Sequence, residues 1–153
     1  MNRENSISLN NEQQNKLANL RWVLGLAIFA LLLYSTPFVI SRILKTPYPF
    51  AAITSNSMWP TIKEGDLVLI EGVTDAKNLK AGDIIVFSQD EDFIIHRIVN
   101  INGAQITTKG DANFSEDDPI LFSNVVGKTV NAGEKPIKIP YLGKLTEFMR
   151  DGS

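Results

Sequence analysis

Twenty consecutive residues without a charge, Trp22 to Ser41, constrain this chain more than any other feature of its sequence. At about 1.5 Å per residue, a helix of this length crosses the roughly 30 Å hydrocarbon core of a bilayer. A helix buried in a soluble domain would show a polar face, and a cleaved signal sequence would have a shorter apolar core and a small-residue cleavage site. Because the run fits neither description, we predict a retained transmembrane helix over residues 22–44.

Charge is distributed unevenly around this run. Residues 1–45 carry five basic and two acidic residues, whereas residues 46–153 carry ten basic and fifteen acidic ones. The positive-inside rule favours a cytoplasmic N-terminus, although only weakly because Arg42 and Lys45 follow the run closely. We therefore predict a single-pass protein of the cell membrane, or of the endoplasmic reticulum membrane in a eukaryote, with an extracytoplasmic acidic domain. Residues 1–21 are polar, and we expect a disordered or short helical tail there.

The composition excludes several classes of chemistry. The chain has no cysteine and one histidine, which rules out a disulfide framework, a thiol nucleophile, a thiolate metal site and histidine-rich zinc motifs. The formal net charge of -2 argues against a nucleic-acid-binding protein held by phosphate contacts. The sequence predicts no metal and no cofactor.

Residues 45–140 have the texture of a β domain, with short apolar runs between clusters of Gly, Asp and Asn. Asn102-Gly103 is a strong signal for a hairpin turn. We predict a mainly β fold, a small antiparallel β domain preceded by one transmembrane helix. The expected strands are 50–54, 67–70, 84–87, 93–101, 104–108 and 125–130. Residues 141–153 form an amphipathic C-terminal segment, expected as a terminal helix packed on the domain or as an interfacial helix at the lipid surface.

Three segments carry residues suited to catalysis. Ser55 and Ser57 follow a predicted strand and can present a nucleophile and a nearby donor, although Ser/Asn/Pro turns are common. Strand alternation places His96, which can act as a base or as a structural histidine, on the face of Ile94 and Ile98. An acidic loop follows from residue 110, and it can orient a histidine ring or serve as a solvated turn. Within it, the triplet 113–115 also matches a glycosylation acceptor, a frequent chance match.

Taken together, these segments resemble a known family. The set Ser55-x-Ser57-Met58-x-Pro60-Thr61, His96-Arg97-Ile98-Val99 and Lys109-Gly110-Asp111-x-Asn113 is similar to signal peptidase I. It resembles the endoplasmic-reticulum-type branch, found also in archaea and some Gram-positive bacteria, in which histidine replaces the lysine of the common bacterial branch. The resemblance covers roughly residues 22–143.

The resemblance implies a role for each matching residue. Ser57 corresponds to the nucleophile and His96 to the general base, and the Ser55 hydroxyl and the Ser57 amide correspond to the oxyanion hole. Asp111 corresponds to one acidic position important in this branch. The second acidic position points to Asp117, or to Asp118 after a one-residue insertion. Which of these three aspartates pairs with His96 is open at this point.

The implied function is removal of signal peptides from exported preproteins by a membrane-bound serine endopeptidase. A substrate with small side chains before the cut is expected to pair as an added strand beside Ala51, Ala52 and Ile53. The partners are preprotein signal peptides and the lipid bilayer, with no nucleic acid, and the sequence names no accessory membrane subunit. One alternative is a non-catalytic, membrane-tethered β-domain scaffold, which requires Ser57 and His96 to lie far apart. A self-cleaving repressor is a second alternative, but such proteins pair serine with lysine and carry a DNA-binding half.

Overall fold

The chain folds into an N-terminal helical unit, up to Ile40, and a β-rich unit that begins at Ser41. In this computed structural model, residues 3–90 and 92–143 are described. Of the predicted C-terminal segment, only residues 141–143 fall in this range, and the expected helical face of Leu142, Leu145, Phe148 and Met149 lies largely outside it.

The N-terminal unit belongs to one helix, α1 (Arg3–Ile43). Its segment Asn19–Ile43 is long and apolar enough to cross a membrane, and none of it is buried inside the protein. A core helix of a soluble domain would be mostly buried, so the apolar surface is available to lipid. The helix already begins at Arg3, in the part expected to be a disordered or short helical tail. Once a long apolar helix exists, each added turn avoids the cost of nucleation.

The second unit is built from strands, as predicted, and all six expected strands are present within a few residues of their predicted bounds. Two short 3-10 helices, η1 (Ala76–Asn78) and η2 (Phe122–Asn124), and four two-residue strands, β6 and β8–β10, add to them. The strands are β1 (Phe50–Ala52), β2 (Leu67–Glu71), β3 (Ile84–Gln89), β4 (Asp92–Asn102), β5 (Gln105–Lys109), β6 (Ile120–Leu121), β7 (Val125–Thr129), β8 (Asn131–Ala132), β9 (Lys135–Pro136) and β10 (Lys138–Ile139).

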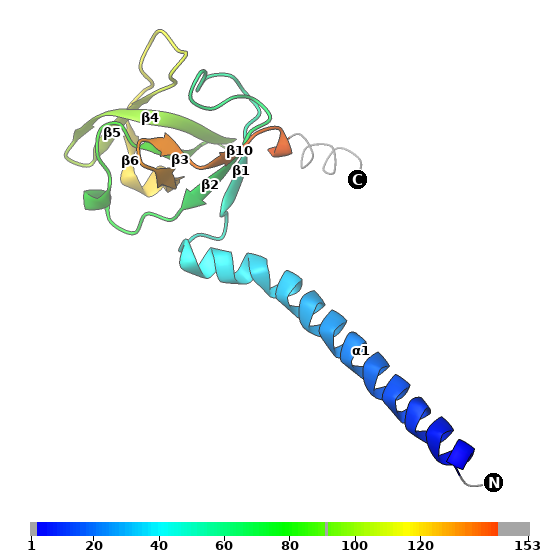
Figure 1. Ribbon diagram of the computed structural model, residues 1–153. Coiled ribbons are helices and arrows are strands. Elements are labelled where there is room, and N and C mark those ends of the chain that lie inside the picture. Colours follow the sequence, from blue (N-terminus) through cyan, green and yellow to red (C-terminus); the bar gives the residue numbers. More distant parts are fainter. Residues whose placement is uncertain (1–2, 91, 144–153) are drawn as a thin grey trace. The chain divides into compact units, whose positions relative to one another are not determined.

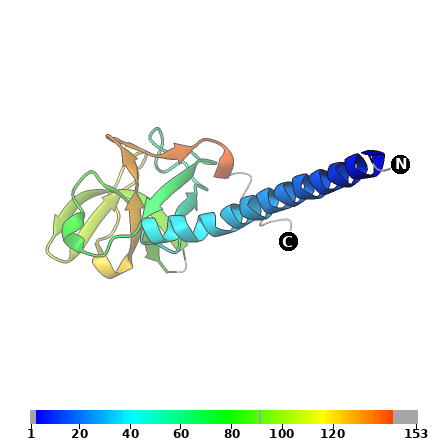
Figure 2. The same cartoon turned by 60° about the horizontal axis from the view of Figure 1, so that its bottom comes forward.

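The strands pair antiparallel in the order β1-β2-β7-β3-β4-β5-β6, with β10 also on β2 and a separate hairpin of β8 and β9. The predicted Asn102-Gly103 turn joins β4 to β5, and Gly103 adopts a positive φ of 60° there. The two views show the sheet curling around itself rather than lying flat (Figures 1 and 2). The mainly β, antiparallel architecture that the sequence predicts is therefore correct.

Strand β3 lies at the centre of the core. Its residues alternate between two apolar clusters, because successive side chains of a strand point to opposite faces. Ile84 and Val86 join a cluster with Met58 and Ile62, whereas Ile85 and Phe87 join one with Ile98. Burial on both faces explains why β3 reads as a continuous apolar run.

Two segments that leave this sheet carry the predicted site. Residues 53–66 run from β1 to β2, and the fully buried side chains of Met58 and Ile62 fix them to the core. Residues 110–119 connect β5 to β6. Both are irregular in backbone, so their positions depend on specific anchors rather than on a ladder of strand hydrogen bonds.

One glycine of the central strands tests this packing. A Cβ added at Gly127 of β7 would lie 2.5 Å from the Glu71 carbonyl oxygen and 2.7 Å from Cγ2 of Ile70. Because backbone cannot move aside easily, we expect Gly127→Ala to lower the free energy of unfolding by about 1–3 kcal/mol. Chemical denaturation in detergent measures this change. Gly25→Ala, whose added Cβ meets nothing within 4 Å, is the matched control, and equal stability of the two variants would contradict the packing described.

Candidate active site

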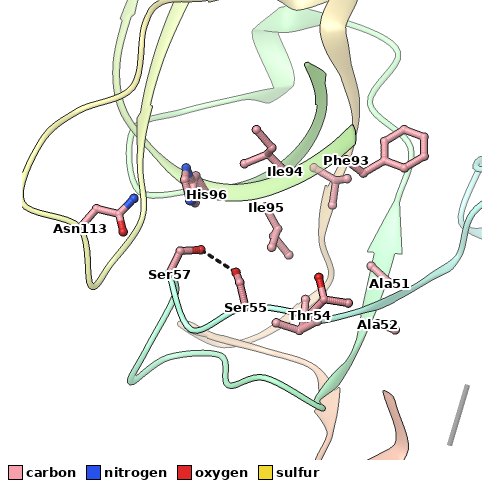
Figure 3. Close-up of a pocket in the computed structure, with 12 residues that line it drawn as sticks. Ala51, Ala52, Thr54, Ser55, Ser57, Phe93, Ile94, Ile95, His96 and Asn113 are labelled. Atoms are coloured by element: carbon pink, nitrogen blue, oxygen red, sulfur yellow. Dashed lines mark hydrogen bonds between the residues drawn. The ribbon is translucent and has the colours of Figure 1, made fainter. Parts of the chain in front are cut away.

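A cleft of about 330 Å³ brings the predicted catalytic residues together. Ser55 and Ser57 line it from the segment after β1, and His96 lines it from β4, together with Ala51, Ala52, Ile53, Thr54, Val86, Phe93, Ile94, Ile95 and Asn113. Figure 3 shows the two serines below the ring of His96, with Asn113 beyond Ser57 and the alanines of β1 beyond Ser55. Ser57 and His96 therefore line the same cleft. The scaffold alternative requires them to lie far apart.

The nucleophile candidate sits on a tight turn. Trp59 N–H donates to the Asn56 carbonyl at 3.0 Å and Ile62 N–H donates to the Met58 carbonyl at 2.9 Å. The hydroxyl oxygens of Ser55 and Ser57 are 3.2 Å apart and form a hydrogen bond in which either can donate (Figure 3). A half-buried serine on such a turn presents its hydroxyl to the cleft.

His96 is almost fully buried, at 7% exposure, on the same face of β4 as Ile98, as strand alternation predicts. Its Nδ1 lies 2.6 Å from Oδ2 of Asp117. Because an ionised carboxylate accepts, this contact assigns the neutral ring's proton to Nδ1 and leaves Nε2 free to accept one. The ring also meets the edge of Phe87, with centroids 6.3 Å apart.

Asp117 is itself held by one threonine. The Thr108 hydroxyl donates to Oδ2 of Asp117 at 2.7 Å, and Asp117 N–H donates to the Thr108 carbonyl at 2.9 Å. Thr108 is fully buried in β5. These contacts leave the carboxylate little freedom to turn away from His96.

Asp111, also predicted as a catalytic residue, has different partners. It accepts from Nε of Arg97 at 2.8 Å, from a terminal nitrogen of the same guanidinium at 2.7 Å and from the Thr61 hydroxyl at 2.6 Å. Asp118, which follows Asp117 in the sequence, is exposed. Of the three aspartates left open by the sequence, Asp117 is therefore the one that hydrogen-bonds the ring.

Opposing effects act on the Asp111 carboxyl. Burial raises its pKa, but the hydrogen bonds from Arg97 and Thr61, with the charges of Arg97 and His96, outweigh burial and hold the pKa below its ordinary value. The same pair raises the pKa of Arg97, mainly through the hydrogen bond to Asp111. The ion pair therefore persists at neutral pH.

The chain has relatives among known proteins. The Peptidase S24-like family matches residues 34–128, more than half of the chain. The signal peptidase complex catalytic subunit SEC11 of Fusarium vanettenii is 35% identical over 141 residues, covering 80% of this chain and 78% of that protein. The chain belongs to the Peptidase S24-like family and is a signal peptidase I homologue.

Other relatives carry related names. SEC11 of Verticillium alfalfae is 29% identical over 138 residues, which cover 78% of this chain and 77% of that protein. Signal peptidase I W of Bacillus subtilis is 38% identical over 84 residues, 51% of this chain but only 44% of that protein. The match thus spans less than half of the Bacillus protein. The family predicted from the serine, histidine and aspartate motifs is confirmed.

Four residues that lie at the site have no role predicted from the sequence. Thr61, Arg97, Thr108 and Asn113 all lie inside or directly beside the motifs quoted for the family. They are close in sequence to the predicted site residues, but their contacts depend on how residues 53–66 and 110–119 pack against each other and against the sheet. The one sequence feature that points to these contacts is Arg97, next to the single histidine. A partly buried guanidinium needs a carboxylate partner, so an aspartate is expected nearby.

The Arg97–Asp111 pair predicts a specific acid response. Since folding lowers the pKa of Asp111, its stabilisation is complete above the ordinary value of 3.8 and is lost as the pH falls through the lowered value. We expect Asp111→Asn to lower the free energy of unfolding at pH 7 by about 1–3 kcal/mol, the usual cost of losing a charge-assisted hydrogen bond. Denaturation at a series of pH values should show this difference shrinking below about pH 4.

Asp118→Asn provides the matched control, because that carboxylate is exposed and its removal should leave stability unchanged. A difference between wild type and Asp111→Asn that stays constant down to pH 2 would contradict the assignment of this ion pair.

Proposed function

We propose that the chain is a membrane-bound serine endopeptidase that removes signal peptides from exported preproteins, with Ser57 as nucleophile and His96 as general base. The observation that carries this proposal is the 2.6 Å contact between His96 and Asp117, on the wall of the cleft that Ser57 lines. A histidine fixed by a carboxylate on one nitrogen can accept a proton on the other, as acyl transfer to serine requires.

The reaction proceeds in two halves. The Ser57 hydroxyl oxygen attacks the scissile carbonyl carbon while Nε2 of His96 takes its proton, and Asp117 stabilises the resulting imidazolium. His96 then donates that proton to the leaving amine, the peptide C–N bond breaks and an acyl-enzyme remains. A water molecule, deprotonated by His96, then attacks the acyl carbon. The ester bond to the Ser57 oxygen breaks, His96 returns the proton to that oxygen, and the signal peptide leaves as a carboxylic acid.

Charge on the carbonyl oxygen is stabilised by two donors. The backbone N–H of Ser57 and the hydroxyl of Ser55 match the oxyanion positions implied by the family. The 3.2 Å contact between the two serine hydroxyls supports this assignment, because it keeps Ser55 beside the reacting oxygen. Losing one such donor typically lowers kcat by ~10²–10³.

The two aspartates have separate roles in this mechanism. Asp117 contacts His96 directly and acts in the chemistry. Asp111 touches Arg97 and Thr61, so it acts as a positioning residue that fixes the acidic loop to β4 and to the turn after Ser57. The predicted catalytic role of Asp111 is therefore revised to an indirect one.

Substrate binds as an extended strand along β1. Among the described strands, β1 pairs with β2 alone, which leaves its other edge open. Ala51 and Ala52 are small and permit close approach of another backbone, whereas Ile53 is buried and its N–H and carbonyl already pair with Asp66 and Gly65. Because hydrogen-bonding direction alternates along a strand, Ala52 and Thr54 offer free backbone groups to the substrate. The role proposed for Ile53 is thus confined to lining the cleft.

The decisive experiment is a cleavage assay in detergent with a labelled preprotein, in which the cut is located by mass. Ser57→Ala and His96→Ala should each lower kcat by on the order of 10⁴–10⁶, because each removes a group that bonds to the reacting atoms. Asp117→Asn should lower it strongly as well, since the ring loses its fixed tautomer. Ser55→Ala should lower it by ~10²–10³.

Asp118→Asn is the matched control for Asp117→Asn, because the two carboxylates are adjacent and Asp118 is exposed. Circular dichroism of each variant separates lost chemistry from lost folding. Near-normal cleavage by folded Ser57→Ala or His96→Ala would overturn the proposed function.

We also propose the orientation predicted from charge, with a cytoplasmic N-terminus and an extracytoplasmic β-rich unit. Because the chain contains no cysteine, single cysteines report sidedness without background. In intact cells, a membrane-impermeant maleimide should label Lys77→Cys, on the exposed helix η1, and should label Ser6→Cys only after lysis. The reverse pattern would refute this orientation.

A further inference from the structure

Asn113 is a polar residue of the cleft that the mechanism above leaves without a role. It lines the same cleft as Ser57 and His96 and is half-buried. Its carboxamide makes no hydrogen bond with any other residue of the part of the chain that the structure describes. Its side-chain nitrogen and oxygen are reached by solvent rather than buried, so a ligand in the cleft can replace water as their hydrogen-bond partner.

The backbone fixes Asn113 relative to the nucleophile. Ala112 N–H donates to the carbonyl of Ser57 at 2.8 Å, and Asn113 N–H donates to the carbonyl of Gly110 at 3.0 Å. The turn that carries Asn113 is thus tied to the residue that carries the reacting hydroxyl. A displacement of one would displace the other.

Gly110 makes this close arrangement possible. A Cβ at that position would lie 2.7 Å from the Ser57 carbonyl oxygen and 2.8 Å from Nδ2 of Asn113. No side chain fits between these atoms. These distances also place the Asn113 carboxamide close to Gly110, within its own turn.

The side of the cleft on which Asn113 lies indicates what it binds. In Figure 3, Ser57 and Ser55 separate Asn113 from Ala51 and Ala52. A substrate that pairs with β1 and presents its scissile carbonyl to Ser57 lies with its signal-peptide part along the alanines. The chain that follows the cut then continues towards Asn113.

We propose that Asn113 binds the backbone of the substrate just after the scissile bond. The carboxamide can donate to a carbonyl and accept from an N–H at the same time, as a neighbouring strand does. Such binding orients the leaving amine towards His96 without reading any side chain. This inference rests on the proposed function and adds a binding residue on the leaving side to it.

Two substrates with one signal-peptide sequence test the proposal. One continues as a peptide for several residues after the cut, and the other ends there in an aminocoumarin amide, which has no backbone beyond the scissile bond. Asn113→Ala should lower kcat/KM for the extended peptide roughly 5- to 50-fold more than for the coumarin amide, as expected for two lost hydrogen bonds. Asn102→Ala, exposed on the turn between β4 and β5, should leave the ratio of the two rates unchanged.

The rates of Asn113→Ala on the two substrates separate a role in binding the leaving side from the other roles that Asn113 could have. Equal losses on both substrates would overturn the proposal, because an oxyanion donor or a general structural role affects both reactions alike. An unchanged rate on the extended peptide would overturn it as well. Cleavage of the coumarin amide shows that the variant is folded, and dependence of both reactions on Ser57 shows separately that the proposed function holds.

Discussion

The arrangement of this active site depends on the ion pair between Arg97 and Asp111. Arg97 is held in β4 directly beside His96, Asp111 begins the acidic loop, and Thr61, which joins them, closes the turn that carries Ser57. Three segments that are distant in sequence are thus connected through one mostly buried carboxylate. A planar guanidinium that binds both carboxylate oxygens provides direction as well as energy. The two irregular segments have no strand ladder between them, and this ion pair fixes them together with the hydrogen bond from Ala112 N–H to the Ser57 carbonyl.

Division of labour between neighbouring aspartates follows from that arrangement. Arg97 and Thr61 donate hydrogen bonds to Asp111. Asp117 instead hydrogen-bonds His96, and the Thr108 hydroxyl of β5 donates to the same Asp117 carboxylate. One end of the loop is therefore anchored to the turn that carries Ser57 and the other to His96. Small changes in loop length between the two carboxylates would misplace the ring partner while leaving the ion pair intact.

Features of this protein that depend on neighbouring residues could be predicted from the sequence, whereas contacts between distant segments could not. The apolar span, the β-rich domain and the Asn102-Gly103 hairpin are set by periodicity and turn chemistry within a few residues. The candidate residues Ser57 and His96, named from short motifs, line one cleft. The sequence leaves the choice among Asp111, Asp117 and Asp118 open, since it depends on contacts across the fold, in which Arg97 binds Asp111 and His96 binds Asp117. The role of Thr108 could not be predicted for the same reason. It depends on the hydrogen bonds between Thr108 and Asp117 and not on the residues next to Thr108 in the sequence.

The open edge of β1 has a consequence for which proteins the enzyme can process. An edge strand offers its N–H and carbonyl groups only to a chain that is itself extended, whatever its sequence. A segment still wound as a membrane helix has those groups occupied internally and presents nothing for Ala52 or Thr54 to pair with. With the proposed pairing along β1, the cleft selects a conformation, and an uncleaved membrane anchor and a cleavable leader of equal apolar content differ only in where the helix ends.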